Sequence, residues 1–212
     1  MSQRPDLVDE HRLWRRGCAR IAGIDEAGRG AWAGPVVAAA VVLPRIPDLR
    51  RLLEPVRDSK VLTPAQRERC YDLVLRYAVD YGIGDAPPEV IDRLGIVPAT
   101  RQAMLKAVAG LECVPDGLII DALALHELSI PQLAIAKADL TCLSVAAASV
   151  LAKVSRDRMM VALDAELPQY GLAAHKGYGT RQHREALHAY GPTDHHRHTF
   201  APISLLLQDD DD

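Results

Sequence analysis

The sequence lacks the patterns that would indicate a zinc knuckle, a disulfide framework or a membrane anchor. Its four cysteines, Cys18, Cys70, Cys113 and Cys142, are widely spread and form no C-x-x-C pair. The polar start has no apolar run of the kind found in signal peptides. The apolar stretches are too short, or too interrupted by charge, to span a bilayer. We therefore expect a cytoplasmic protein with no membrane association.

The sequence also lacks a strong charge of either sign. The formal net charge is −3, and Asp209–Asp212 alone supply four negative charges, so the rest of the chain is close to neutral. A neutral average does not identify a nucleic-acid binder, and it does not exclude one, because a local basic strip decides binding. We expect residues 204–212 to form an acidic, disordered tail.

The pattern of apolar residues predicts a layered α/β domain. No internal repeat or long linker is present, and 49% of the 212 residues are hydrophobic, enough for one sizeable core. Expected helices and strands alternate, as in layered α/β proteins. We assign 1–18 to an N-terminal helical segment and 19–203 to the main domain. The expected helices are 7–16, 64–77, 98–111, 141–166 and 181–190, and the expected strands are 19–25, 36–43, 79–83, 118–121 and 133–136.

Acidic residues stand at the ends of three expected strands. Asp25 and Glu26 end the first, Asp121 ends another, and Asp139 follows the last. Ligand sites in open α/β sheets lie beyond strand ends, so these carboxylates can converge. Oxygen-rich sites suit Mg²⁺ or Mn²⁺, and two such ions can promote in-line hydrolysis of a phosphodiester. The alternative is that Asp25 and Glu26 only cap a loop, and this segment alone leaves that open.

The glycines after this acidic pair also suggest a dinucleotide-binding loop. However, Gly28, Gly30 and Gly34 have the spacing G-x-G-x-x-x-G, and Pro35 and a strand follow where such a loop requires a helix. The acidic pair would moreover repel a pyrophosphate. The nicotinamide or flavin alternative is therefore disfavoured.

Several ordered segments resemble the ribonuclease HII family. The resemblance covers most of 20–203 and implies a ribonuclease H-like fold, with a mixed, partly antiparallel sheet, flanking helices and a small helical C-terminal extension. The matching segments are GIDEAGRG (23–30), GPVVAAAVVL (34–43), DSK (58–60), IDAL (120–123), AKAD (136–139), SVAAASVLAKVSRDRMM (144–160), PQYGLAAHKGYGTRQH (168–183) and HHRHTFAPI (195–203).

The resemblance implies an endonuclease acting on RNA–DNA hybrids and on duplex DNA that contains ribonucleotides. It implies cutting on the 5′ side of the ribonucleotide by a two-metal-ion mechanism, which leaves a 3′-hydroxyl and a 5′-phosphate. The four acids would be the catalytic ligands of Mg²⁺ or Mn²⁺. The substrate contacts that it implies are Gly28, Arg29, Gly30, Lys60 and Tyr178.

The physical chemistry of these residues supports those roles. RNA differs from DNA at a site chiefly by the 2′-hydroxyl. Backbone groups approach it most closely where side chains are absent, as at glycines, and Arg29 between them keeps its charge and can pair with phosphate.

Simpler explanations exist for several of these residues. Tyr178 could be a core tyrosine, Lys60 an ordinary surface lysine, and Lys153 and Asp157 an i,i+4 ion pair. The histidines at 195, 196 and 198 form a cluster on composition alone, but no second ligand set completes a zinc site. The chain also departs from the family where many members have Asp-Gly at 121–122 and Gly-Asp-Ser at 138–140.

Two other functions remain to be weighed. A hybrid-binding module without catalysis would gain nothing from four carboxylates near phosphates. A phosphohydrolase acting on small molecules would have no use for Tyr178 or for the segment Gly28-Arg29-Gly30, called the glycine loop below. We therefore expect a catalytic endonuclease that acts as a monomer.

Overall fold

The computed structural model describes residues 4–209, and these contain a five-stranded mixed sheet between two helical layers. The strand order is β3-β2-β1-β4-β5, with β3, β2 and β1 antiparallel and β1, β4 and β5 parallel. The expected mixed sheet is confirmed. The strands are β1 (Ile21–Ala27), β2 (Val36–Val42), β3 (Asp80–Ala86), β4 (Gly117–Asp121) and β5 (Gln132–Ile135).

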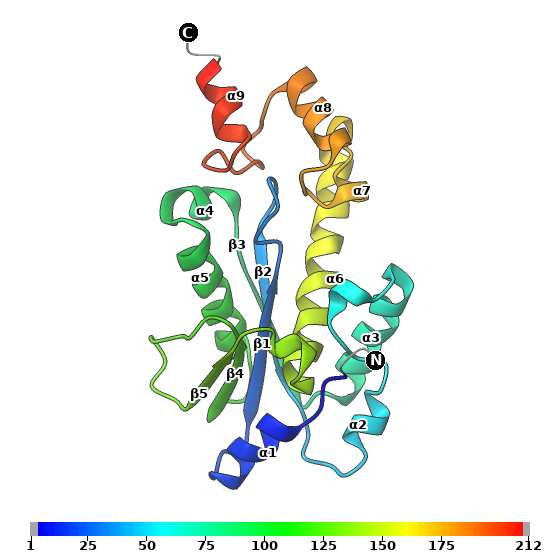
Figure 1. The fold of residues 1–212 in the computed structure, drawn as a ribbon, viewed down its shortest axis with the longest axis vertical. Helices are drawn as coiled ribbons and strands as arrows, with labels where there is room; N and C mark the ends of the chain where they lie inside the picture. The colour runs from blue at the N-terminus through cyan, green and yellow to red at the C-terminus, as the bar shows by residue number, and fades with distance from the viewer. Residues whose placement is uncertain (1–3, 210–212) are drawn as a thin grey trace.

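Helices cover both faces of the sheet and one of its ends (Figure 1). Two of them start at recognisable caps: Thr63 forms a capping box with Gln66, and Thr180 accepts a hydrogen bond from the backbone N–H of His183. The helices are α1 (Val8–Arg15), α2 (Leu49–Leu52), α3 (Pro64–Tyr77), α4 (Pro88–Leu94), α5 (Ile96–Ala109), α6 (Leu143–Glu166), α7 (Leu172–His175), α8 (Arg181–Tyr190) and α9 (Ile203–Asp209), with 3₁₀ turns at η1 (Ser59–Val61), η2 (Ala138–Leu140) and η3 (Pro168–Tyr170).

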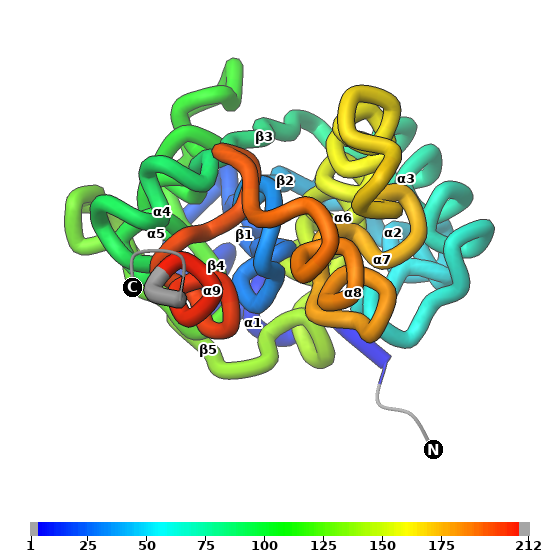
Figure 2. Tube along the Cα trace, turned by 90° about the horizontal axis from the view of Figure 1, so that it is seen from above, coloured from blue at the N-terminus to red at the C-terminus, as the bar shows by residue number. Residues whose placement is uncertain are grey.

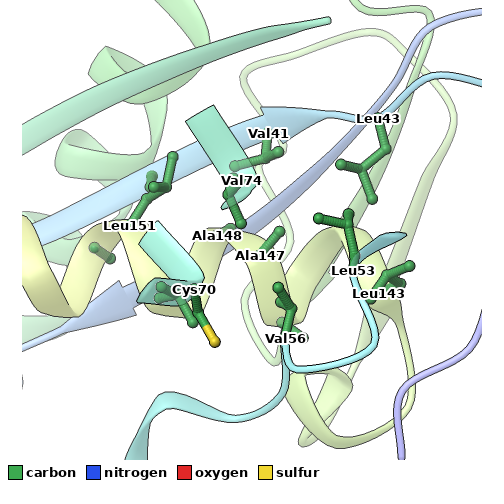
Figure 3. Packing of buried hydrophobic residues seen from close by; sticks show 14 of the residues in the cluster. Val41, Leu43, Leu53, Val56, Cys70, Val74, Leu143, Ala147, Ala148 and Leu151 are labelled. Carbon is green, nitrogen blue, oxygen red and sulfur yellow. The ribbon is translucent and has the colours of Figure 1, made fainter. Parts of the chain in front are cut away.

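Strand β2 is buried along its whole length because each face meets a different helix. Ala39 and Val41 face α6 and α3, whereas Ala38 and Ala40 belong to the core under α5. Figure 3 shows the first of these cores, with Val41 among side chains from α3, α6 and the segment that follows α2. Alternating small residues thus let one strand serve two cores.

Glycines in the strands allow the helices to pack close to the sheet. A Cβ at Gly23 of β1 would lie 2.3 Å from the carbonyl carbon of Ser144 in α6. On the other face, a Cβ at Gly82 or Gly84 of β3 would lie 2.0 or 2.3 Å from a backbone oxygen of α5. The close approach of α6 at Gly23 is the one that shapes the site, because Asp25 follows on the same face of β1.

The C-terminal extension lies beyond the end of β1 and the start of β2 (Figures 1 and 2). Backbone hydrogen bonds join Trp32 to Gly177, Gly34 to His195 and Arg197 to Trp32. Ile203 is fully buried in the core of this extension. The expected disordered tail differs from the structure at residues 204–209, which belong to helix α9, and its last three residues lie outside the described part.

Within the described residues, no helix has the length and apolar character needed to cross a membrane.

Candidate active site

The structure brings the four acids together at one edge of the sheet. Strands β1 and β4 run parallel with Ile24 opposite Ile120, so Asp25 and Asp121 follow at the same level. Asp139 lies in η2, directly after β5. Asp25 and Asp139 are 2% and 3% exposed. The strand ends therefore bring the carboxylates to one position, where Asp25 and Asp139 are buried and Glu26 and Asp121 are partly buried.

Asp25 is the most deeply buried of the four acids. Burial, and then the neighbouring carboxylate of Glu26, raise its pKa well above the ordinary value, although a hydrogen bond from Ser149 opposes the shift. The Ser149 hydroxyl also meets the hydroxyl of Ser59 at 3.0 Å. One carboxylate oxygen of Asp25, Oδ2, is buried without a hydrogen-bond partner. A buried acid of this kind requires a cation or a proton.

Internal donors occupy one oxygen of each of the other three acids. Arg29 Nη1 contacts Glu26 Oε1 at 3.0 Å. The backbone N–H of Ala138 donates to Asp121 Oδ1 at 2.8 Å, and Lys60 Nζ lies 3.2 Å from Asp139 Oδ2.

The pKa values of Glu26 and Asp121 are also raised. Burial is the main cause for both; Arg29 opposes it at Glu26, and the Ala138 N–H opposes it at Asp121. The negative charge of this site therefore exceeds what its internal partners neutralise.

The acids fit a hard divalent cation in donor chemistry but are not arranged around one. Among residues 4–209, no three His, Cys, Asp or Glu side chains already form a metal-binding group. The contacts of Lys60, Arg29 and the Ala138 N–H explain this, because they hold oxygens that would otherwise face an ion. Two buried oxygens, Asp25 Oδ2 and Glu26 Oε2, remain without partners. An all-oxygen set suits Mg²⁺ or Mn²⁺, and the Lys60 side chain is 71% exposed, free to withdraw.

Two non-glycine residues beside the acids have left-handed backbone conformations. Ala122 follows Asp121 with φ 60°, and Lys137 precedes η2 with φ 60°. Glycine, which the family resemblance led us to expect at position 122, adopts this conformation without strain. The departure therefore leaves Asp121 in place but puts backbone strain next to it.

A buried arginine holds the glycine loop from the interior of the protein. Arg197 is fully buried and donates to the carbonyls of Gly28, Arg29 and Gly34 at 2.7–3.1 Å. Burial, and then the charge of Arg156, lower the pKa of Arg197 to about 9. The loop carbonyls thus point inward, toward this guanidinium.

A second buried arginine joins that loop to the turn that carries Tyr178. Arg156 donates to the carbonyls of Ala33, Pro35 and Lys176 at 2.8–3.0 Å. Its guanidinium carbon also lies 5.4 Å from the centroid of the Tyr178 ring. The ring is 37% exposed, so Tyr178 is a surface aromatic supported from behind.

The sequence did not reveal Arg156 or Arg197 as parts of the site. Both lie in segments that match the family, but nothing in their spacing separates a buried arginine from a surface one. The expected ion pair of Lys153 with Asp157 is confirmed at 2.6 Å.

Replacing Gly28 with alanine is expected to destabilise the protein by about 2 kcal/mol or more, the scale of backbone strain combined with a steric clash. Gly28 has φ +93°, and an added Cβ would lie 1.9 Å from Arg156 Nε. The measurement is chemical denaturation. Gly30→Ala is the matched control, since its Cβ would meet no atom within 4 Å. Equal stability of the two variants would contradict this account of the loop.

The strand order and the layers around this sheet are those of the ribonuclease H-like fold, and the acids at its edge place the chain in the class of metal-dependent nucleases. A family model described as Ribonuclease HII matches residues 22–203. The chain belongs to the ribonuclease HII family. It is accordingly a metal-dependent endoribonuclease that cleaves RNA in RNA–DNA hybrids and acts at ribonucleotides embedded in DNA.

Individual relatives agree with this assignment. The chain is 54% identical to the ribonuclease HII of Chloroflexus aurantiacus over 96% of each sequence. It is 50% identical to that of Dehalococcoides mccartyi, over 96% of both chains. Among solved structures, the ribonuclease H2 of Pyrococcus horikoshii superposes with a TM-score of 0.76 at 26% identity, covering 90% of this chain and 98% of that one. A Bst-RNase HIII structure in complex with Mn²⁺ has a TM-score of 0.70 at 20% identity, covering 90% of this chain and 70% of that one, and shows likeness of fold.

Proposed function

We propose that Asp25, Glu26, Asp121 and Asp139 are the catalytic acids and hold two divalent ions, Mg²⁺ or Mn²⁺. The reaction is hydrolysis on the 5′ side of a ribonucleotide, leaving a 3′-hydroxyl and a 5′-phosphate. The observation that carries the proposal is the pair of unpartnered buried oxygens, Asp25 Oδ2 and Glu26 Oε2, beside two further carboxylates. A buried carboxylate oxygen without a partner costs free energy, and a bound cation would remove that cost.

The bound ions would supply activation of the attacking water and stabilisation of the leaving 3′-oxygen. The protein itself determines the positions of the four carboxylates. The Ala138 N–H holds one oxygen of Asp121, and the contacts of Lys60 and Arg29 with Asp139 and Glu26 would be exchanged for the cations when these bind. Lys60 neutralises Asp139 in their absence and, once displaced, reaches the phosphate backbone with its long exposed side chain.

The glycine loop is the proposed reader of the ribose. Gly28 and Gly30 leave the backbone open to close approach, and Arg29 provides a charge for the neighbouring phosphates. Tyr178 provides an exposed ring to pack on the sugar at the cut junction. The support for a joint role is that Arg156, Arg197 and the Trp32–Gly177 backbone bond hold the loop and the Tyr178 turn as one unit.

A basic cleft next to Tyr178 supports binding of a duplex. It has a volume of about 550 Å³ between α3, α6 and the turn after α7. Its lining includes four cationic side chains, Arg67, Lys153, Arg158 and Lys176, of which Lys153 and Arg158 are paired with the lining acids Asp157 and Glu68. The excess positive charge of Arg67 and Lys176 supports phosphate contacts, which set the position of a duplex without reading its sequence.

We further propose that residues 19–203 form the catalytic domain and that the chain acts as a monomer in the cytoplasm. A single chain supplies every residue named above. The four cysteines, which all fall in the described part of the chain, are free thiols, as suits a reducing compartment.

Chelation with EDTA is expected to abolish cleavage of a labelled duplex that contains one ribonucleotide, and Mg²⁺ or Mn²⁺ should restore it. The ions should also stabilise the protein itself, by about 2.7 kcal/mol at a concentration of 100 Kd, because they bind the folded site. Thermal unfolding with and without the ion measures this independently of activity. Full activity in chelator would contradict the two-ion site.

A further inference from the structure

A pair of buried histidines lies directly behind the Tyr178 turn. His183 of α8 and His196 of the C-terminal extension are 0% and 1% exposed, and their Nε2 atoms are 3.2 Å apart. The ring of His175 stacks on that of His183 at 4.5 Å. Neither member of the pair touches the four acids, and the mechanism above gives them no role.

The hydrogen bonds of His196 determine which of its ring nitrogens carries the proton. The backbone N–H of Thr193 donates to His196 Nδ1 at 3.0 Å. A ring nitrogen that accepts from an N–H cannot carry a proton itself, so a neutral His196 has its proton on Nε2. That Nε2–H points at His183 Nε2, which must therefore be the acceptor.

The His183 end leads to the same arrangement independently. His183 Nδ1 lies 3.1 Å from the carbonyl oxygen of Tyr178, which can only accept. The proton of a neutral His183 is therefore on Nδ1, and its Nε2 is bare. The chain of donors runs from the Thr193 N–H through His196 and His183 to the Tyr178 carbonyl, with one possible placement of its protons.

This series of hydrogen bonds requires both histidine rings to be neutral. A further proton on His183 would set two N–H donors against each other across 3.2 Å, and a further proton on His196 would lie on Nδ1, against the Thr193 N–H at 3.0 Å. Burial, followed by the charge of His175, lowers the pKa of His183 to about 4, and burial, followed by the charge of His183, lowers that of His196 to about 4.

The surroundings of the pair also favour the neutral form. The titratable side chains that face it are basic or phenolic: His175, His195, His198 and the ring of Tyr170, which lies 4.9 Å from His196. The proton arrangement therefore holds across the ordinary working range of pH.

The turn that receives this hydrogen bond is strained and must be held. Lys176 and Gly177 both have positive φ, 53° and 78°, and the first is a conformation that lysine rarely adopts. Three successive carbonyls accept hydrogen bonds: that of Lys176 from Arg156, that of Gly177 from the backbone of Trp32 and Ala33, and that of Tyr178 from the Thr180 N–H at 2.8 Å and from His183 Nδ1 at 3.1 Å. Of the side-chain donors, only His183 bonds to the residue that carries the aromatic ring, and it ties that residue to the histidine pair.

We propose that His183 and His196 are positioning residues, which together hold the backbone of Tyr178 so that its ring meets the sugar of the ribonucleotide. The proposal rests on the proposed role of Tyr178. His183 supplies the bond to the turn, and His196 sets the proton arrangement that makes His183 a donor. The pair therefore acts on substrate through Tyr178 and not by touching it.

A double-mutant cycle tests the proposal. His183→Leu removes the donor, and we expect kcat/KM on a single-ribonucleotide duplex to fall at least about tenfold, since a 1 Å displacement of a positioned group can cost about 10²-fold. His183→Asn keeps an N–H at the place of Nδ1 and should recover most of that loss. His188→Leu, on the exposed face of the same helix, is the control and should match the wild type.

The second half of the cycle uses Tyr178→Ala as background. If His183 acts through Tyr178, adding His183→Leu to Tyr178→Ala should lower kcat/KM less than about twofold further, because the two changes remove one function. A full additional tenfold loss would overturn the proposal. A Tyr178→Ala protein with wild-type activity would instead remove the proposed role of Tyr178, and the positioning role with it, while leaving the four acids untouched.

The proton arrangement is measurable without activity. In protein labelled with ¹⁵N-histidine, the ring nitrogen shifts should report a neutral His183 protonated on Nδ1 and a neutral His196 protonated on Nε2, at pH 7 and still at pH 5.5. The His183→Asn variant assigns the signals. A His183 that is charged at pH 5.5, or protonated on Nε2, would overturn the proposal even if the variants lost activity through misfolding.

Discussion

Asp25→Asn is expected to lower kcat by at least about 10²-fold while the protein stays folded. The substitution keeps the shape of the side chain but removes one charge from the most buried of the four acids. A central ligand contributes several kcal/mol of transition-state stabilisation, and each 1.36 kcal/mol is tenfold in rate. Single-turnover cleavage of a duplex with one ribonucleotide measures the effect. Near-normal rates from folded protein would remove Asp25 from the site.

The same variant should be more stable than the wild type in chelator, and the difference should grow with pH. The pKa of Asp25 is raised in the folded state, so its contribution to stability is fully present below the ordinary pKa of an aspartate. That contribution is lost as pH rises toward the folded value, since the folded state then holds the proton more tightly. Asparagine has no such loss. Denaturation at a series of pH values in EDTA measures the difference, with Asp72→Asn, at an exposed position of α3, as the control. A difference that shrinks toward pH 8 would contradict the assigned shift.

A duplex with one ribonucleotide should be nicked at that position about 10⁴-fold faster than the same duplex made entirely of DNA. A site built to hydrogen-bond a hydroxyl is left with unpaired buried groups when the hydroxyl is missing, and discrimination of this size follows. The open backbone at Gly28 and Gly30 gives the access that such a contact needs. Rates on matched duplexes that differ in one 2′-hydroxyl, at saturating Mg²⁺, provide the measurement.

Two controls separate recognition from catalysis in that experiment. Tyr178→Ala should weaken cleavage at the isolated ribonucleotide, yet Mg²⁺ should still raise its melting temperature, because no metal ligand is lost. Equal cutting of the all-DNA duplex by the wild type would show that the glycine loop is not a ribose reader. Stabilisation by Mg²⁺ would in that case still support the four acids.

The acids could be found from sequence because their position follows from local pattern. Asp25 and Asp121 end apolar runs, and parallel strands end at one edge of a sheet. Strand β3 extends to Ala86, beyond the expected strand 79–83, and Gly82 and Gly84 lie within it. They are there because α5 packs too closely on β3 for a side chain, a fact of tertiary packing that no local pattern contains.

The buried arginines that hold the glycine loop could not be found from sequence in the same way. Arg156 and Arg197 have backbone carbonyls as partners, and a carbonyl has no signature in sequence. The histidines near residue 196 were considered only as a metal tract, because nothing local indicates that His196 meets His183 across a turn. Helix α9 also extends into the segment expected to be disordered. Each of these features depends on contacts between distant segments.

The hydrogen bond from Arg197 to Gly28 joins residues 169 positions apart and has a consequence for the order of synthesis. A ribosome makes the glycine loop early and all four acids by residue 139, but the guanidinium that holds the loop is made long after them. Domains generally fold as units, so the loop cannot close on its arginine until residue 197 has been made. A chain truncated before that residue would keep all four acids and lose the guanidinium that holds the ribose reader.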